Sequence, residues 1–127
     1  NKLCVNDHSC PNSISQYAGI EALRGTKETI DDIKKEFHKR KNFVHSKLNE
    51  LEKINCFEPG GAFYAFPNIS KSGMSAQKFA DIALEEKGVA LVPGTSFGKS
   101  CTNFVRFSFA NSYENIEKAL EKIKKIL

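Results

Sequence analysis

No tryptophan and a single methionine occur among the 127 residues, and no apolar run approaches the roughly 18–20 residues that a membrane-spanning helix needs. The first residues also lack the basic-then-apolar layout of a secretory signal peptide. The four cysteines are scattered and form no Cys-x-x-Cys pair, the close spacing on which zinc sites and redox motifs depend. We therefore expect no membrane partner, no metal site and, because unpaired cysteines suit a reducing compartment, a cytoplasmic location.

The composition is that of an ordinary globular domain. Hydrophobic residues make up 40% and charged residues 27%, which excludes intrinsic disorder, collagen-like repeats and coiled-coil rods. The net charge is +4, and residues 24–53 hold nine lysines and arginines against six acidic residues. Three of the four excess charges therefore lie in this segment. A basic segment of mixed sign is typical of a solvated helix face, so we expect no nucleic-acid partner.

The spacing of apolar residues predicts a small α+β domain. Helical spacing covers residues 13–23, about 28–52, 75–87 and about 112–127, whereas short strands are expected at 62–66, 89–92 and 104–109. The expected order is α-α-β-α-β-β-α, with a small, mainly antiparallel sheet that carries helices on one side. In the last strand, alternation places Val105, Phe107 and Phe109 on one face and Arg106 on the other.

Arg106 is the most informative residue for function. It lies in the middle of the apolar strand Phe-Val-Arg-Phe-Ser-Phe, and no acidic residue occurs within five positions on either side. A buried guanidinium without a partner costs several kcal/mol, so it must meet an internal acid or an external anion. A ligand carboxylate bound by both arms of the guanidinium is the functional interpretation. A structural ion pair or a position at the sheet edge are the alternatives.

Two glycine-containing loops are the next candidates. They are Glu-Pro-Gly-Gly-Ala-Phe-Tyr at 58–64 and Val-Pro-Gly-Thr-Ser-Phe-Gly at 92–98. Glycine lets the backbone approach a ligand closely, and Phe63 or Tyr64 in one loop and Phe97 in the other would line such a site. A plain turn at the end of a strand is the alternative interpretation of each.

Read together, four segments resemble the C-terminal part of class I pyridoxal-phosphate aminotransferases, the aspartate aminotransferase-like branch of fold type I. The matching segments, in the family's order, begin with Ser-Cys-Pro-Asn-Ser-Ile-Ser-Gln-Tyr-Ala-Gly-Ile-Glu-Ala-Leu at 9–23 and Pro-Gly-Gly-Ala-Phe-Tyr-Ala-Phe-Pro-Asn-Ile at 59–69. Gly-Val-Ala-Leu-Val-Pro-Gly-Thr-Ser-Phe-Gly follows at 88–98, and Val-Arg-Phe-Ser-Phe-Ala at 105–110. From the first to the last they extend over residues 9–110, which is most of the chain.

The resemblance implies roles for single residues. Arg106 corresponds to the arginine that binds the α-carboxylate of the substrate, and Phe63, with Gly61 beside it, corresponds to the aromatic wall of the substrate pocket. Arg40 resembles a structural arginine of the long interdomain helix. We expect no catalytic and no cofactor-binding residue in this chain, because the lysine that binds pyridoxal phosphate should lie upstream of Asn1.

The resemblance also implies the domain organisation and the activity. Residues 1–25 would form the last helix of a large cofactor-binding domain, and residues 26–127 a C-terminal small domain with its long interdomain helix. The parent protein would move an amino group between an amino acid and a 2-oxo acid, as a homodimer, and this chain alone would be inactive. The alternatives are another pyridoxal-phosphate enzyme of the same fold, such as a carbon–sulfur lyase, or a non-catalytic binding domain.

Overall fold

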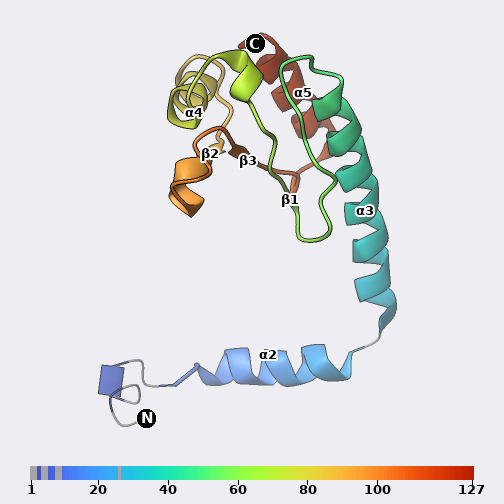
Figure 1. Ribbon diagram of the computed structural model, residues 1–127. Helices are drawn as coiled ribbons and strands as arrows, with labels where there is room; N and C mark the ends of the chain where they lie inside the picture. Colours follow the sequence, from blue (N-terminus) through green and yellow to red (C-terminus); the bar gives the residue numbers. More distant parts are fainter. Residues whose placement is uncertain (1–2, 4–5, 8–9, 26) are drawn as a thin grey trace. The chain divides into compact units, whose positions relative to one another are not determined.

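The computed structural model describes residue 3, residues 6–7, 10–25 and 27–127 (Figure 1). Residue 9, the first of the first matching segment, and residue 26, at the expected domain boundary, lie outside the described residues. The chain divides into two compact units, Asn1–Ile33 and Lys34–Leu127. Each unit is described by itself.

Helix α2, Ser13–Arg24, is the main element of the first unit. Its start is capped by Asn12, whose side-chain oxygen accepts a hydrogen bond of 2.8 Å from the Ser15 amide. The helix ends at Gly25, as the sequence predicts. Its apolar stripe is exposed within this unit, since Ile14 is 81% and Leu23 is 91% accessible.

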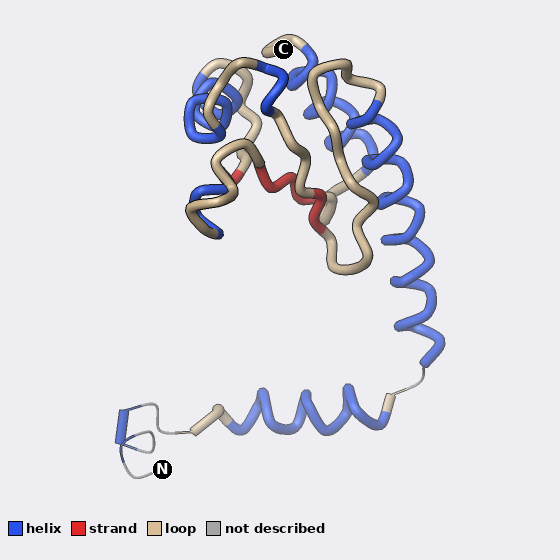
Figure 2. Tube along the Cα trace, in the orientation of Figure 1, coloured by secondary structure: helices blue, strands red, loops and turns tan. Residues whose placement is uncertain are grey.

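The second unit contains an antiparallel sheet of three short strands and three helices (Figures 1 and 2). Helix α3, Lys27–Asn49, leads into this unit and is followed by β1 (Tyr64–Ala65), α4 (Ala76–Glu85), β2 (Val92–Pro93), β3 (Val105–Ser108) and α5 (Tyr113–Lys124). Two 3₁₀ turns, Ser70–Ser72 and Gly94–Phe97, complete the order. The strands lie in the order β1-β3-β2, and both pairings are antiparallel. The predicted α+β class and the order α-α-β-α-β-β-α are confirmed.

Two strands are shorter than the sequence predicts. The expected strand 62–66 is paired only at Tyr64–Ala65, because Ala62 has a φ of 59° and the chain still turns there. The expected strand 89–92 shrinks to Val92–Pro93. The Val89 amide donates instead to the Ala83 carbonyl at 2.7 Å, so this segment closes the end of α4 before it joins the sheet.

The predicted helix starts in the second unit are confirmed by their caps. The Ser75 hydroxyl accepts from the Lys78 amide at 3.3 Å and begins α4, and Ser112 does the same for α5 with the Asn115 amide, also at 3.3 Å. Helix α4 is followed by Gly88 at a φ of 64°, where a side chain would be strained.

The core lies between one face of the sheet and the helices. Val105, Phe107 and Phe109 are 2%, 4% and 0% exposed, as their alternation predicts. They belong to one buried cluster with side chains from all three helices, including Val44 and Leu48 of α3, Phe79 and Ala83 of α4, and Ile116, Leu120 and Ile123 of α5. The helices therefore cover this face and leave the opposite one, which carries Arg106, to form a site.

Candidate functional site

Arg106 lies at the centre of the sheet's open face. It pairs with Val92 across β3 and β2, and it stands between the buried residues Val105 and Phe107. On the other side of β3, Tyr64 pairs with Ser108, two residues beyond Arg106 on the same face. The sheet register thus brings Tyr64 and Arg106 together as diagonal neighbours, a spacing that long side chains can bridge.

Two aromatic rings contact the Arg106 guanidinium. Its Cζ atom lies 4.3 Å from the centroid of the Tyr64 ring and 5.0 Å from that of Phe97. Tyr64 belongs to β1, on one side of β3, and Phe97 to the 3₁₀ turn that follows β2, the strand on the other side. Both distances are within the range of a favourable cation–π interaction.

Arg106 forms no ion pair with an acidic side chain in the part of the chain that the structure describes. The nearby acid Glu58 is engaged elsewhere, since its carboxylate lies 2.6 Å from Lys41 Nζ. The hydrogen bond and the charge of Lys41 hold the pKa of the Glu58 carboxyl below its ordinary value. No carboxylate among the described residues therefore neutralises the Arg106 guanidinium.

Two cavities meet at the aromatic side chains beside Arg106. One, of about 260 Å³, is lined by Tyr64, Phe66, Phe97 and Arg106. The other, of about 340 Å³, shares Tyr64 and Phe66 and extends to Phe57, Glu58, Pro59, Gly61 and Phe104. The site thus combines one cation with a mainly aromatic lining, which suits a small organic anion.

The loop 94–98 needs its glycines to place Phe97. Gly94 is buried, its amide donates to the Phe104 carbonyl at 2.7 Å, and a Cβ atom there would lie 2.1 Å from the Cys101 carbonyl oxygen. Gly98 has a φ of 149°, which side chains rarely adopt. The Phe97 ring then meets Phe66 edge-on, with 5.8 Å between centroids. Gly94 thus allows close packing of this turn against the chain's own backbone, and the approach of the loop to a ligand stays a prediction.

The predicted site residues are only partly brought together. Arg106 and Phe97 are in contact, and Gly61 lines the second cavity. Phe63 is 40% exposed and packs on Phe37, with 6.2 Å between ring centroids, and it lines neither cavity. Its neighbour Tyr64 contacts the guanidinium instead. The glycine pattern left Phe63 and Tyr64 as alternatives and the resemblance favoured Phe63, whereas the strand register places Tyr64 beside Arg106.

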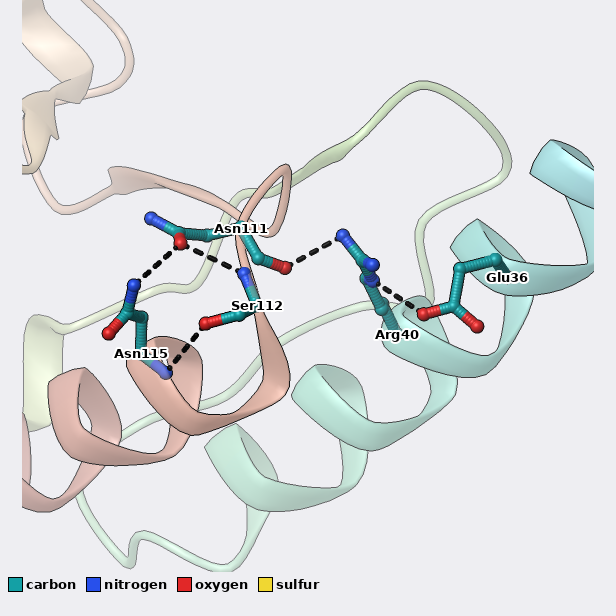
Figure 3. A network of polar contacts seen from close by, with 5 residues as sticks. All are labelled: Glu36, Arg40, Asn111, Ser112 and Asn115. Atoms are coloured by element: carbon teal, nitrogen blue, oxygen red, sulfur yellow. Dashed lines mark hydrogen bonds and ion pairs between the residues drawn. The ribbon is translucent and has the colours of Figure 1, made fainter.

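Arg40 takes part in a separate network of polar contacts between α3 and the start of α5 (Figure 3). Its Nε donates to Glu36 at 2.9 Å and its Nη1 to the Asn111 carbonyl at 2.7 Å. The Asn111 side-chain oxygen accepts in turn from the Ser112 amide and the Asn115 side chain. These contacts join α3 to the start of α5 and give Arg40 a structural role.

Metal and membrane sites find no support in the described residues. No group of three or more His, Cys, Asp or Glu side chains in that part of the chain is placed to hold a metal ion. Nor is any helix among those residues both long and apolar enough to cross a membrane.

Comparison with known proteins identifies relatives along nearly the whole chain. The family model described as aminotransferase class I and II matches residues 4–123. An aspartate aminotransferase of Pyrococcus horikoshii is 43% identical over 117 residues, which are 91% of this chain and 30% of that protein. An aromatic-amino-acid aminotransferase of Thermococcus litoralis is 36% identical over 121 residues, 94% of this chain and 31% of the relative.

A solved structure has the same fold. The aromatic aminotransferase from Pyrococcus horikoshii superposes with a TM-score of 0.91 at 36% identity, over 99% of this chain and 34% of that one. The chain therefore spans about a third of the length of the relatives that it matches. With the family model covering most of its residues, the chain belongs to the class I and II aminotransferase family.

Proposed function

We propose that this chain is the substrate-carboxylate-binding part of a pyridoxal-phosphate-dependent aminotransferase. The observation that carries the proposal is the Arg106 guanidinium, which lies on the open face of the sheet against two aromatic rings and has no carboxylate partner among the described residues. Family membership supports the reaction class, in which an amino group moves between an amino acid and a 2-oxo acid. The relatives named above are aminotransferases of aspartate and of aromatic amino acids.

Arg106 contributes binding and orientation. Its planar fork matches a carboxylate with two parallel N–H···O bonds, which fix the direction as well as the position of the amino acid. Tyr64, Phe66 and Phe97 surround the guanidinium with aromatic surface, and an ion pair formed there is strengthened to the extent that the ligand displaces water. Fixing the substrate in this way lowers the entropic cost of reaching a reactive geometry.

The cofactor does not fit the residues present near Arg106. Pyridoxal phosphate supplies an electron sink for amino transfer and needs a lysine amine for covalent attachment. Neither cavity beside Arg106 is lined by a lysine. We therefore propose that this lysine and the other cofactor contacts belong to parts of the protein beyond the 127 residues. Borohydride reduction of the protein from its source cells, followed by peptide mapping, should label a lysine outside 1–127. A labelled lysine within 1–127, or none, would contradict this assignment.

Steady-state kinetics of the full-length protein test the role of Arg106. Arg106→Ala should cost about 2–5 kcal/mol of substrate binding, because the ligand carboxylate loses its charged partner. Arg106→Lys keeps the charge but not the fork, so its KM should lie between those of the wild type and Arg106→Ala. Lys99→Ala, which removes an exposed cation close to the same loop, is the matched control.

The same assay separates the reaction classes. Amino transfer that depends on a 2-oxo acid supports the proposal, whereas release of pyruvate without an acceptor would indicate a carbon–sulfur lyase. If Arg106→Ala keeps its KM within a few-fold of the wild type, Arg106 is not the carboxylate site.

The proposal also includes the oligomeric state of the full-length protein and its cellular compartment. Family membership supports a homodimer for the full-length protein, which light scattering tests: a monomeric mass would contradict it. The thiols of Cys10, Cys56 and Cys101 are free and support a reducing, cytoplasmic compartment.

A further inference from the structure

We infer that Tyr64 and Phe97 are positioning residues, which hold the guanidinium of Arg106 in the orientation that accepts the ligand carboxylate. The inference rests on the proposed function, because it concerns how the proposed carboxylate site is kept ready. It goes further than that function because it says that two aromatic rings from different parts of the chain fix the guanidinium before the ligand binds.

The arginine needs such support. Its side chain has four rotatable bonds, and in the part of the chain that the structure describes no carboxylate holds its charged end. An unsupported side chain of this length loses substantial rotamer entropy when it binds a ligand. The two ring contacts, at 4.3 Å to Tyr64 and 5.0 Å to Phe97, restrict the guanidinium before the ligand arrives. The rotamer entropy of the Arg106 side chain is then lost when the chain folds, so its loss does not weaken ligand binding.

Ring contacts suit this task better than an acid would. A carboxylate beside Arg106 would compete with the substrate for the same N–H donors. An aromatic ring attracts the cation through its face but accepts no strong hydrogen bond, so the donors stay available. The one nearby acid that lines the adjoining cavity, Glu58, is held by Lys41 at 2.6 Å.

The rings are themselves fixed by the fold. Tyr64 is placed by its strand pairing with Ser108 of β3. Phe97 is placed by the 3₁₀ turn and by its edge-on contact with Phe66. Phe66 stacks on Phe104, with centroids 5.1 Å apart and planes 8° from parallel. The guanidinium thus contacts a series of packed aromatic side chains that ends at Phe104, the residue before β3.

Kinetics of the full-length holoenzyme test the inference. Tyr64→Leu and Phe97→Leu should each raise the KM for the amino acid about three- to tenfold, the range expected for one cation–π contact, while kcat changes less than about twofold. Tyr64→Phe and Phe97→Tyr keep a ring and should keep the wild-type KM. In the Arg106→Ala background, Tyr64→Leu should change KM by less than about twofold, because no cation is left for the ring to hold.

Tyr113→Leu is the matched control. The Tyr113 ring also contacts an arginine, with Arg40 Cζ 5.7 Å from its centroid, but it lines neither cavity beside Arg106. This substitution should lower the thermal midpoint and leave KM unchanged. It separates a general loss of packing from a specific loss at the site.

The outcomes distinguish the two proposals. If Arg106→Lys raises KM but both leucine variants do not, the positioning role is wrong and the proposed function stands. If Tyr64→Phe loses as much as Tyr64→Leu, the hydroxyl and not the ring matters, and the inference is again overturned. If Arg106→Lys leaves KM unchanged, the proposed function itself fails. Phe97 is 50% exposed, so Phe97→Leu decides the matter even if Tyr64→Leu does not fold.

Discussion

Cys56 illustrates how burial alone changes the chemistry of one residue. Its side chain is 3% exposed, and removal from water raises the pKa of the thiol, since the charged thiolate is disfavoured there. We expect iodoacetamide at mildly alkaline pH to alkylate Cys56 more slowly than the exposed Cys10, measured by mass spectrometry of peptides. Equal rates for the two cysteines would show that Cys56 is accessible in solution.

The raised pKa of Cys56 also sets the sign of a pH effect on stability. Between the ordinary thiol pKa and the higher pKa in the folded state, the unfolded chain releases a proton that the folded chain keeps. The free energy of unfolding should therefore fall as the pH rises through this window. In Cys56→Ala this contribution should be missing from urea titrations at several pH values. A pH dependence equal to that of the wild type would rule out Cys56 as its source.

At the residue scale, the sequence predicts the arginine of the site better than it predicts the aromatic residues that surround it. Arg106 stands out because a charge within an apolar strand demands a partner, and Phe97 because it precedes a glycine in a loop. The pattern did not separate Phe63 from Tyr64, and the resemblance favoured Phe63, because the direction of a side chain in a two-residue strand depends on the strand's register. That register, Tyr64 opposite Ser108, joins residues 44 positions apart.

The turn Gly94–Phe97 is the element most sensitive to a small change. A Cβ atom at Gly94 would lie 2.1 Å from the Cys101 carbonyl oxygen and 2.6 Å from that of Phe104, both backbone atoms. Gly94→Ala should therefore lower the free energy of unfolding by about 1–3 kcal/mol, the usual cost of overpacking. Denaturant titration measures it. Gly60→Ala is the control, since no atom lies within 4 Å of a Cβ there, and it should unfold like the wild type. Equal stability of both variants would contradict the crowding at Gly94.

The junction of α3 and α5 depends on Arg40 (Figure 3). Arg40→Met keeps much of the aliphatic side chain but removes the bonds to Glu36 and to the Asn111 carbonyl. We expect a loss of about 1–3 kcal/mol in the free energy of unfolding, as for hydrogen bonds to a charged group. Lys39→Met, at an exposed neighbouring position of the same helix, should stay within about 0.5 kcal/mol of the wild type. Thermal unfolding followed by circular dichroism compares the two, and equal midpoints would show that the network adds nothing.

At the element scale, the helices could be predicted more closely than the strands. Helix starts have local causes, the caps Ser75 and Ser112, which the sequence displays directly. Strand ends depend on distant partners. Residues 89–91 have a strand-like composition, but the Val89 amide donates to the Ala83 carbonyl of α4, a contact that only the tertiary structure determines.

At the scale of the whole molecule, the buried core belongs to one unit. All members of the main cluster fall between Val44 and Ile123, within the unit Lys34–Leu127. We expect a chain of residues 34–127 to unfold cooperatively, with a free energy of unfolding within about 1 kcal/mol of that of the 127-residue chain. Urea denaturation monitored by circular dichroism tests this. A broad, non-cooperative transition of the shorter chain would show that residues 1–33 are needed for the core.

The central claim concerns the whole site: the Arg106 guanidinium binds the carboxylate of the substrate. The most direct test uses the full-length protein and its Arg106→Ala variant, and it measures dissociation constants for a 2-oxo acid and for the amide of the same acid. Replacing the carboxylate by the amide should weaken binding to the wild type by about 2–5 kcal/mol and leave binding to Arg106→Ala nearly unchanged, because the partner is already gone. The same loss in both proteins would show that the carboxylate is bound elsewhere.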